Sequence, residues 1–169
     1  VECGACKVAC PFGAVADRSF IVPLIQDLKT TKKVFAMVAP AFVGQFGAGI
    51  SPKKIFQALK QLGFSGVYEV ALGADMVTLF EAEEFLETVP EQRKYMTTSC
   101  CPAFADLIRK HMPNILPHMS STTSPMVATA EIVKKEYPDS VAVFIGPCAA
   151  KKSEARRYPD LIDYVITYE

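Results

Sequence analysis

Residues 32–40 read KKVFAMVAP, a continuous apolar run rich in β-forming residues that ends at Pro40. A run of this length is typical of a strand buried on both faces of a sheet. Residues 140–147 read SVAVFIGP, have the same character and also end at a proline. The sequence therefore predicts at least two strands in the interior of the protein.

Amphipathic segments separate the apolar runs. In the clearest, residues 51–64, Ser51 is a suitable N-cap, Pro52 suits the first helical position and Gly63 suits the end of a helix. Further helices are predicted over 74–89, 102–112, 123–137 and 150–158, and further strands over 66–73, 94–99 and 163–169. Strands that alternate with helices of ten or more residues indicate βαβ units, so we expect an α/β fold with a largely parallel sheet flanked by helices.

In parallel sheets, ligand sites collect where the strands end. The segment TTSCCP at 97–102 follows one predicted strand, and IGPCAAKK at 145–152 ends another. We therefore expect Cys101 and Cys148 to face one crevice.

The composition excludes several classes of function. Eighteen basic residues balance eighteen acidic ones without a basic block, so a nucleic-acid role has little support. Proline and glycine interrupt the apolar runs before the roughly 18 residues that a bilayer span needs, and no leader is visible. We therefore expect a cytoplasmic protein without a membrane role, in which six cysteines are more typical of metal ligands or catalytic thiols than of disulfides.

Three of these cysteines lie in CGACKVACP. Cys3, Cys6 and Cys10 match the last three cysteines of the bacterial ferredoxin run C-x2-C-x2-C-x3-C-P, whose first cysteine would precede Val1. Thiolates suit iron, so the motif predicts part of a 4Fe-4S site. Three reduced structural cysteines remain the alternative. A zinc site needs a fourth ligand, and both histidines are remote in the sequence.

The segments 98–104, TSCCPAF, and 145–155, IGPCAAKKSEA, together resemble two signatures of the catalytic domain of [FeFe]-hydrogenases, TSCCPxW and MPCxxKxxE. The resemblance extends over nearly all of residues 34–169, and the third signature of the family lies further on. We therefore expect three parts: a truncated ferredoxin-like motif over 1–16, a partly helical connector over 17–31, and the N-terminal lobe of the catalytic domain over 32–169.

The resemblance also implies roles for individual residues. Cys101 and Cys148 would be two of the four ligands of the cubane of the H-cluster, which joins a 4Fe-4S cubane to a di-iron subsite. Lys151 would bond a cyanide of the di-iron subsite. Cys100 would pass protons to that subsite, a role that suits a weakly acidic thiol.

A proton relay to the surface is implied as well. It would comprise Glu84, Ser120 and Glu81, with Glu154 at a nearby acidic position. Glu81 and Glu84 are three residues apart on a predicted helix and share a face. Without the resemblance, a solvated side of the helix would be the preferred interpretation, and Glu83 between them is expected to be solvated.

The walls of the di-iron pocket are expected from Ala39, Pro40 and Ala41 and from Gly146 and Pro147, although VAPA is also a normal strand end. The sequence departs from the family here. Phe104 replaces tryptophan, Gly146 replaces methionine, and Thr123 and Met126 replace lysine and glutamine. A glycine for methionine is expected to open the pocket, which puts turnover in doubt.

The leading hypothesis is a fragment of a ferredoxin-linked hydrogenase that forms H2 reversibly from protons and electrons. Its expected partners are ferredoxin or another low-potential carrier, the C-terminal half of the domain, and hydrogenase maturases. The fragment alone is expected to be inactive, with bare thiols, and to self-associate through exposed apolar surface. The alternatives are a hydrogenase-like redox sensor or iron-sulfur protein without hydrogen turnover, and a zinc or thiol-exchange module.

Overall fold

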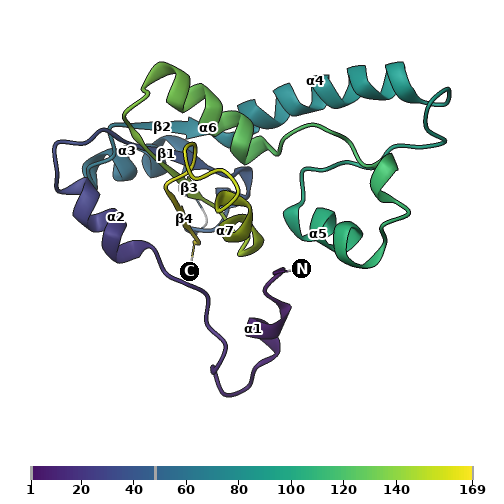
Figure 1. Ribbon diagram of the computed structural model, residues 1–169. Helices are drawn as coiled ribbons and strands as arrows, with labels where there is room; N and C mark the ends of the chain where they lie inside the picture. Colours follow the sequence, from purple (N-terminus) through teal and green to yellow (C-terminus); the bar gives the residue numbers. More distant parts are fainter. Residues whose placement is uncertain (1, 48, 169) are drawn as a thin grey trace.

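The computed structural model describes residues 2–47 and 49–168. Its four parallel strands form one sheet in the order β2-β1-β3-β4, which confirms the predicted α/β fold (Figure 1). The strands are β1 (Val34–Val38), β2 (Gly66–Glu69), β3 (Val141–Ile145) and β4 (Tyr164–Ile166). The helices are α1 (Ala5–Ala9), α2 (Ile21–Leu28), η1 (Pro40–Phe42), α3 (Pro52–Gln61), α4 (Val70–Thr88), α5 (Pro102–His111), η2 (Leu116–His118), α6 (Pro125–Glu136) and α7 (Ala150–Ala155).

The two central strands, β1 and β3, are buried along their whole length, as their sequences predict. Successive side chains of a strand point to opposite faces, so β1 contributes to two cores. Phe35 and Met37 pack with Met126 of α6 on one face. Ala36 packs with Leu24 of α2 on the other. Helices therefore cover both faces, and the carboxyl ends of β1 and β3 remain side by side at one edge.

Helix α4 begins at Val70, earlier than the predicted start at residue 74, and β2 ends at Glu69. The predicted strand over 66–73 is therefore too long. Gly73 explains the position of the helix, because a Cβ atom there would lie 2.6 Å from the carbonyl oxygen of Pro125 at the start of α6. The missing side chain allows α4 to cross α6 closely, a tertiary contact that the local pattern of β-forming residues does not reveal.

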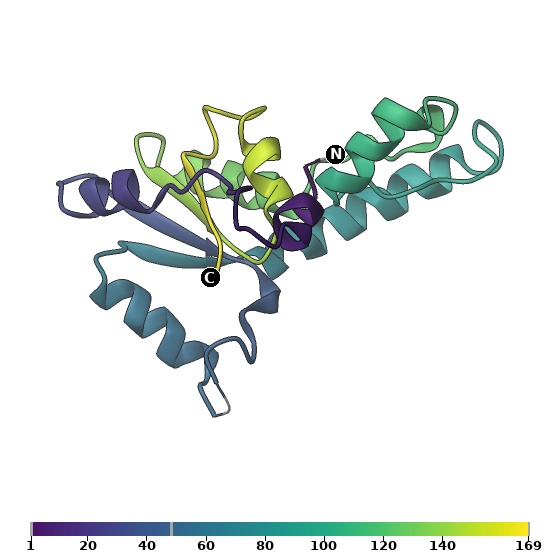
Figure 2. The ribbon, with the colours of Figure 1, turned by 90° about the horizontal axis from the view of Figure 1, so that it is seen from below.

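Residues 94–99 do not form the predicted strand. Thr97 alone pairs, in a single bridge to Met119. The Thr97 amide donates to the His118 carbonyl and the Ser120 amide donates to the Thr97 carbonyl, both at 2.8 Å. Within the described ranges, no strand pairs with this segment beyond that single bridge, so its β-forming residues do not form a strand. The bridge nevertheless holds the turn before α5 against the loop before α6, beyond the sheet and near the far half of α4 (Figure 2).

The cysteine-rich N-terminal segment contains α1 and packs against the start of α7. A Cβ atom on Gly4 would lie 3.5 Å from the Ala149 side chain. Asp17 pairs with Lys7 at 2.8 Å and also with Lys152. The connector is partly helical, as predicted, because α2 lies within it. Val1 and Glu169, the outer ends of the predicted segments 1–16 and 32–169, lie outside the described residues.

Candidate functional site

The two cysteine segments that are distant in the sequence lie next to each other in the fold. Cys101 immediately precedes α5, and Cys148 lies between β3 and α7. Lys151 joins the segments, because its Nζ atom donates to the carbonyl oxygen of Cys100 at 3.2 Å. All three cysteines are free thiols, with Cys101 exposed and the other two half-buried.

Lys151 and Glu154 form a buried ion pair on α7. Their residues are 9% and 5% exposed, and Nζ lies 2.6 Å from Oε2. A protonated lysine has three N–H donors, and two of them bond the carboxylate and the Cys100 carbonyl. Among the residues that the structure describes, the third donor bonds no protein group, so it is available to a ligand. Glu154 therefore pairs with lysine, and within the described residues it makes no hydrogen bond to the other predicted relay residues.

A cavity of about 630 Å³ lies between the N-terminal segment and the residues that follow β3 and β4. Cys3, Pro147 and Cys148 line it, together with Tyr168. Cys101 is not part of its lining, so this cavity does not provide the single crevice expected for Cys101 and Cys148. The reason is that Cys101 belongs to the α5 region, beyond the sheet edge where Cys148 lies.

The N-terminal cysteines Cys6 and Cys10 are exposed and half-buried, respectively. Backbone hydrogen bonds from Phe12 and Ala14 lower the pKa of the Cys10 thiol, which favours the thiolate that iron binds. Among the residues that the structure describes, no three histidine, cysteine, aspartate or glutamate side chains converge as a metal site. The ferredoxin motif therefore stays a prediction.

The expected pocket walls meet at the carboxyl ends of β1 and β3. The Ala39 amide donates to the Ile145 carbonyl at 2.8 Å, and both Ala39 and Gly146 are buried. A Cβ atom on Gly146 would lie 2.6 Å from the Phe144 ring and 3.0 Å from the Ala39 side chain. The expectation that this glycine opens the pocket is wrong, because the phenylalanine ring fills the space. The remaining wall residues are exposed: Pro40, Ala41 and Pro147.

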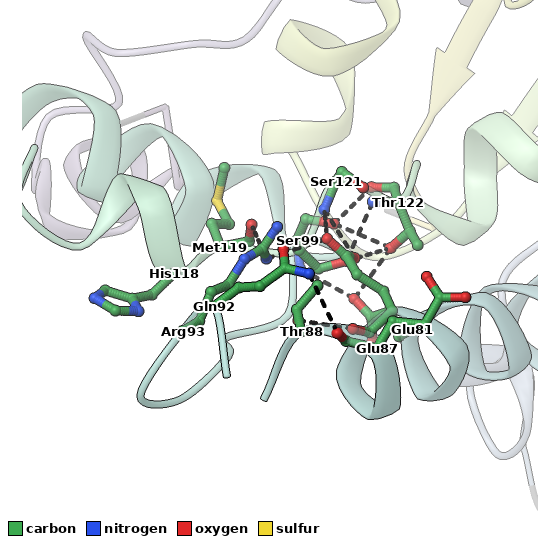
Figure 3. Close-up of polar contacts among 12 residues, drawn as sticks. Glu81, Glu87, Thr88, Gln92, Arg93, Ser99, His118, Met119, Ser121 and Thr122 are labelled. Atoms are coloured by element: carbon green, nitrogen blue, oxygen red, sulfur yellow. Dashed lines mark hydrogen bonds and ion pairs between the residues drawn. The ribbon is translucent and has the colours of Figure 1, made fainter. Parts of the chain in front are cut away.

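The carboxylates of Glu81 and Glu84 both reach from α4 to the loop before α6. Figure 3 shows this loop, with Ser121 and Thr122, beside the helix that carries Glu81. The Ser120 hydroxyl donates to Glu84 Oε2 at 2.7 Å, and the Ser121 amide donates to both Glu84 oxygens at 3.1 Å. Glu81 Oε1 accepts from the Ser99 amide at 3.3 Å. The two carboxylates therefore face protein groups, unlike a fully solvated helix side, whereas Glu83 is exposed as expected.

Thr122 lies between the two carboxylates. Its hydroxyl donates to Glu81 Oε1 at 3.2 Å and lies 2.8 Å from the Ser120 hydroxyl. The Ser99 hydroxyl donates to the Thr122 carbonyl at 2.6 Å, which fixes the backbone of the loop. A continuous chain of four oxygen atoms thus runs from Glu84 through Ser120 and Thr122 to Glu81.

Several effects act on the Glu84 carboxyl. Burial raises its pKa, but hydrogen bonds from Ser120 and Ser121 and the nearby Arg93 charge outweigh burial, so the pKa is lowered overall. The Arg93 guanidinium lies 3.1 Å from Glu84 and donates to the Met119 carbonyl at 3.3 Å. Glu84 is therefore held in its ionised form at neutral pH.

The Cys100 thiol lies 3.7 Å from the Thr98 hydroxyl. No hydrogen bond joins this thiol to Glu81 within 2–47 and 49–168. The neighbouring Ser99 amide does bond Glu81, so the thiol and the carboxylate flank the same short piece of backbone.

A comparison with protein families identifies the family of the chain. The family described as "Iron only hydrogenase large subunit, C-terminal domain" matches residues 32–169. The chain belongs to this family. The NADP-reducing hydrogenase subunit HndD of Solidesulfovibrio fructosivorans is 30% identical over 98% of the chain, which covers 33% of that protein. A variant of the apo [FeFe]-hydrogenase HydA1 from Chlamydomonas reinhardtii superposes with a TM-score of 0.79 at 29% identity, covering 89% of this chain and 46% of that one.

This iron-only hydrogenase domain also resembles proteins with a different role. The cytosolic Fe-S cluster assembly factor NAR1 of Kluyveromyces lactis is 35% identical over 48% of the chain, which covers 18% of that protein. The chain thus spans less than half the length of each of these relatives. No helix within the described ranges is long and apolar enough to cross a bilayer.

Three polar residues of this hydrogenase-family site do not follow from the sequence reasoning, namely Arg93, Ser99 and Thr122. Arg93 lies after the end of α4 and reaches back to Glu84, a contact without a helical spacing. The hydroxyl run SSTTS at 120–124 is the one signal that could have indicated Thr122. The resemblance directed attention to Ser120 alone.

Proposed function

We propose that the protein containing this chain catalyses the reversible reaction 2H⁺ + 2e⁻ ⇌ H2 as an [FeFe]-hydrogenase. The observation that carries this proposal is the oxygen chain between Glu84 and Glu81, which ends beside the backbone of the Cys-Cys-Pro turn. Proton carriers adjacent to a pair of thiols suit an enzyme that consumes protons at a metal centre.

The thiols and the lysine at the start of α5 and at the sheet edge suit part of an H-cluster by their donor chemistry. Cys101 and Cys148 would supply two soft thiolate ligands to its cubane, and the rest of the domain would supply the others. The free donor of Lys151 would bond the di-iron subsite, with Ala39, Pro40, Ala41, Gly146 and Pro147 around it. When bound, the cofactor would supply the electrons and the metal site at which hydrogen forms.

Cys100 would hold the proton nearest that site. Its half-buried thiol has a hydroxyl partner in Thr98, and its carbonyl is fixed by Lys151. Glu81, Ser120 and Glu84 would exchange protons with the surface. Glu154 would act indirectly, because its carboxylate orients the Lys151 ammonium.

Electrons would enter through the N-terminal segment. Cys3 and Cys148 line the same cavity, and Asp17 ties the segment to α7. A ferredoxin-type 4Fe-4S cluster on Cys3 and Cys6 would then lie close to the cubane, and Cys10 would serve the other cluster of a two-cluster module. A ferredoxin or other low-potential carrier would reduce these clusters.

The rest of the catalytic domain would pack against apolar side chains that this chain exposes. Leu72, Leu79 and Leu86 repeat every seven residues along α4 and are 56%, 66% and 79% exposed. An exposed apolar row of this kind also favours self-association of the isolated chain. We expect the intact protein in the cytoplasm, where its free thiols stay reduced and maturases are available.

The test is hydrogen production by the full-length protein after maturation. Iron content and infrared bands of bound cyanide and carbon monoxide would report loading, and gas chromatography would report turnover in both directions. Loaded protein is expected to make hydrogen, and Cys100→Ala is expected to lose turnover while it retains the cofactor. Loaded protein that neither makes nor oxidises hydrogen would contradict the proposal.

A second candidate is an iron-sulfur protein without hydrogen turnover, in the manner of a cluster assembly factor or a redox sensor. The match to NAR1 favours it, as does the Phe144 ring in the space beside Gly146. This candidate predicts protein that binds a cubane after maturation but shows no cyanide or carbon monoxide bands.

A further inference from the structure

The oxygen chain between α4 and the loop before α6 has fewer hydroxyl hydrogens than contacts. It contains three oxygen contacts, of 2.7 Å between Glu84 and Ser120, 2.8 Å between Ser120 and Thr122, and 3.2 Å between Thr122 and Glu81. Each hydroxyl has one hydrogen to donate. When both carboxylates are ionised, two hydrogens serve three contacts, and one contact must lack a hydrogen.

The other groups nearby do not supply the missing hydrogen. The Ser99 hydroxyl lies 3.4 Å from the Thr122 hydroxyl, but its hydrogen goes to the Thr122 carbonyl at 2.6 Å. The Thr122 amide donates to the Ser120 oxygen at 3.1 Å, which leaves that oxygen one further lone pair. A single proton on either glutamate completes all three contacts.

We propose that Thr122 is the positioning residue that joins Glu81 to Ser120 and Glu84, so that the relay proposed above acts as one proton wire that binds a single shared proton. The assignment of this wire to catalysis rests on the hydrogenase function proposed above. The wire itself rests on the hydrogen count and the contacts of Thr122.

Transfer along the wire is balanced in atoms and charge. The O–H bond of protonated Glu81 breaks as its hydrogen moves to Thr122, the Thr122 hydrogen moves to Ser120, and the Ser120 hydrogen moves to Glu84. Three O–H bonds break and three form, so one positive charge moves from Glu81 to Glu84 without electron transfer. This direction serves hydrogen oxidation, because Glu81 lies beside the Cys-Cys-Pro turn, and the reverse order serves hydrogen formation.

The two ends of the wire differ in their surroundings. Glu84 has further donors in the Ser121 amide and Arg93, whereas Glu81 has the Ser99 amide. The additional donors at Glu84 stabilise its ionised form and lower its pKa, so a proton that reaches Glu84 leaves readily.

The test is an infrared pH titration of the full-length protein without the di-iron cofactor. The carboxylic acid band of Glu84 is assigned by its loss in Glu84→Gln. The pKa of Glu84 is then measured with and without Glu81→Gln, in protein with the natural Thr122, with Thr122→Ser and with Thr122→Val. Thr123→Val is the matched control, because Thr123 has no hydrogen bond to either carboxylate within the described residues.

When Glu84 is protonated, the hydroxyl hydrogens of the wire point towards Glu81, and ionised Glu81 accepts the hydrogen bond from Thr122. Glu81→Gln should therefore lower the pKa of Glu84 when residue 122 carries a hydroxyl. In the Thr122→Val background this effect should be smaller by more than about 1 pH unit, since only direct repulsion between the carboxylates remains. Thr122→Ser and Thr123→Val should behave as the natural protein does.

An equal effect in all backgrounds would overturn the wire, and so would a Thr122→Ser variant that behaves as Thr122→Val. The readout needs no hydrogen turnover, so it separates the two proposals. Coupled titration in protein that makes no hydrogen leaves the wire standing and refutes the enzyme, whereas uncoupled titration in an active enzyme refutes the wire.

Discussion

The buried pair of Lys151 and Glu154 gives the largest expected effect of a single substitution. Lys151→Met removes the ammonium group that lies 2.6 Å from the carboxylate of Glu154, a residue that is 5% exposed. Breaking a buried ion pair by removing one partner costs about 3–5 kcal/mol, since the remaining charge is left without compensation. We expect a loss of this size in the free energy of unfolding, a large part of the roughly 5–15 kcal/mol of a typical domain.

The assay is urea unfolding at pH 7, with the slope compared between variants so that changes in compactness are recognised. The double variant Lys151→Met/Glu154→Met should regain most of the loss, because an apolar pair of similar volume is about neutral relative to a buried ion pair. Lys135→Met, on the exposed side of α6, is the control and should stay within about 0.5 kcal/mol. A cost below about 1 kcal/mol for Lys151→Met, or a double variant that is no more stable than Lys151→Met, would show that the buried carboxylate is not left uncompensated.

Three further predictions concern other parts of the chain. Ser120→Ala should lower the free energy of unfolding at pH 7 by about 1.5–3 kcal/mol, because Glu84 loses a hydrogen-bond donor. The lowered pKa of Glu84 contributes stability that is fully present above about pH 4.3 and is lost as the pH falls through the folded pKa, so the deficit of the variant should shrink in acid. A deficit that stays constant with pH would refute this prediction. Gly146→Ala should cost about 1–3 kcal/mol in thermal unfolding through the clash with Phe144, and an unchanged midpoint would contradict this packing. Asp17→Asn should speed proteolysis of the N-terminal segment, and equal cleavage rates would show that its ion pairs do not hold it.

The sequence predicts the sheet and most helices because their signals are local. The buried runs around Phe35 and Phe144 form the two central strands, and Ser51 is the N-cap of α3, accepting from the Lys54 amide as a capping residue should. The start of α4 and the segment over 94–99 were predicted wrongly because both depend on distant partners. The effect of Gly73 depends on its close contact with α6, which the local sequence does not reveal. Likewise, β-forming residues become a strand only when another strand pairs with them.

The candidate site was predictable only as far as the signatures extend. The resemblance named Glu84 and Ser120, which the structure brings to 2.7 Å, but no local rule connects Thr122 to Glu81 or Arg93 to Glu84. These contacts arise where a loop, a turn and a helix meet beyond the sheet. Hydroxyl side chains are common in loops, so their role depends on geometry more than on spacing.

The oxygen chain also bears on the choice between an enzyme and a cluster carrier. When both carboxylates are ionised, one contact of this half-buried network lacks a hydrogen, and an unmade contact in a low dielectric is costly. A carrier would hold its cubane equally well with apolar residues at these positions, so proton handling is the better explanation of the chain. The wall formed by Phe144 beside Gly146 concerns a different requirement, the fit of the di-iron subsite. Proton handling and cofactor loading can therefore fail separately, and a protein that titrates as a wire but takes up no di-iron subsite would have its defect at this wall.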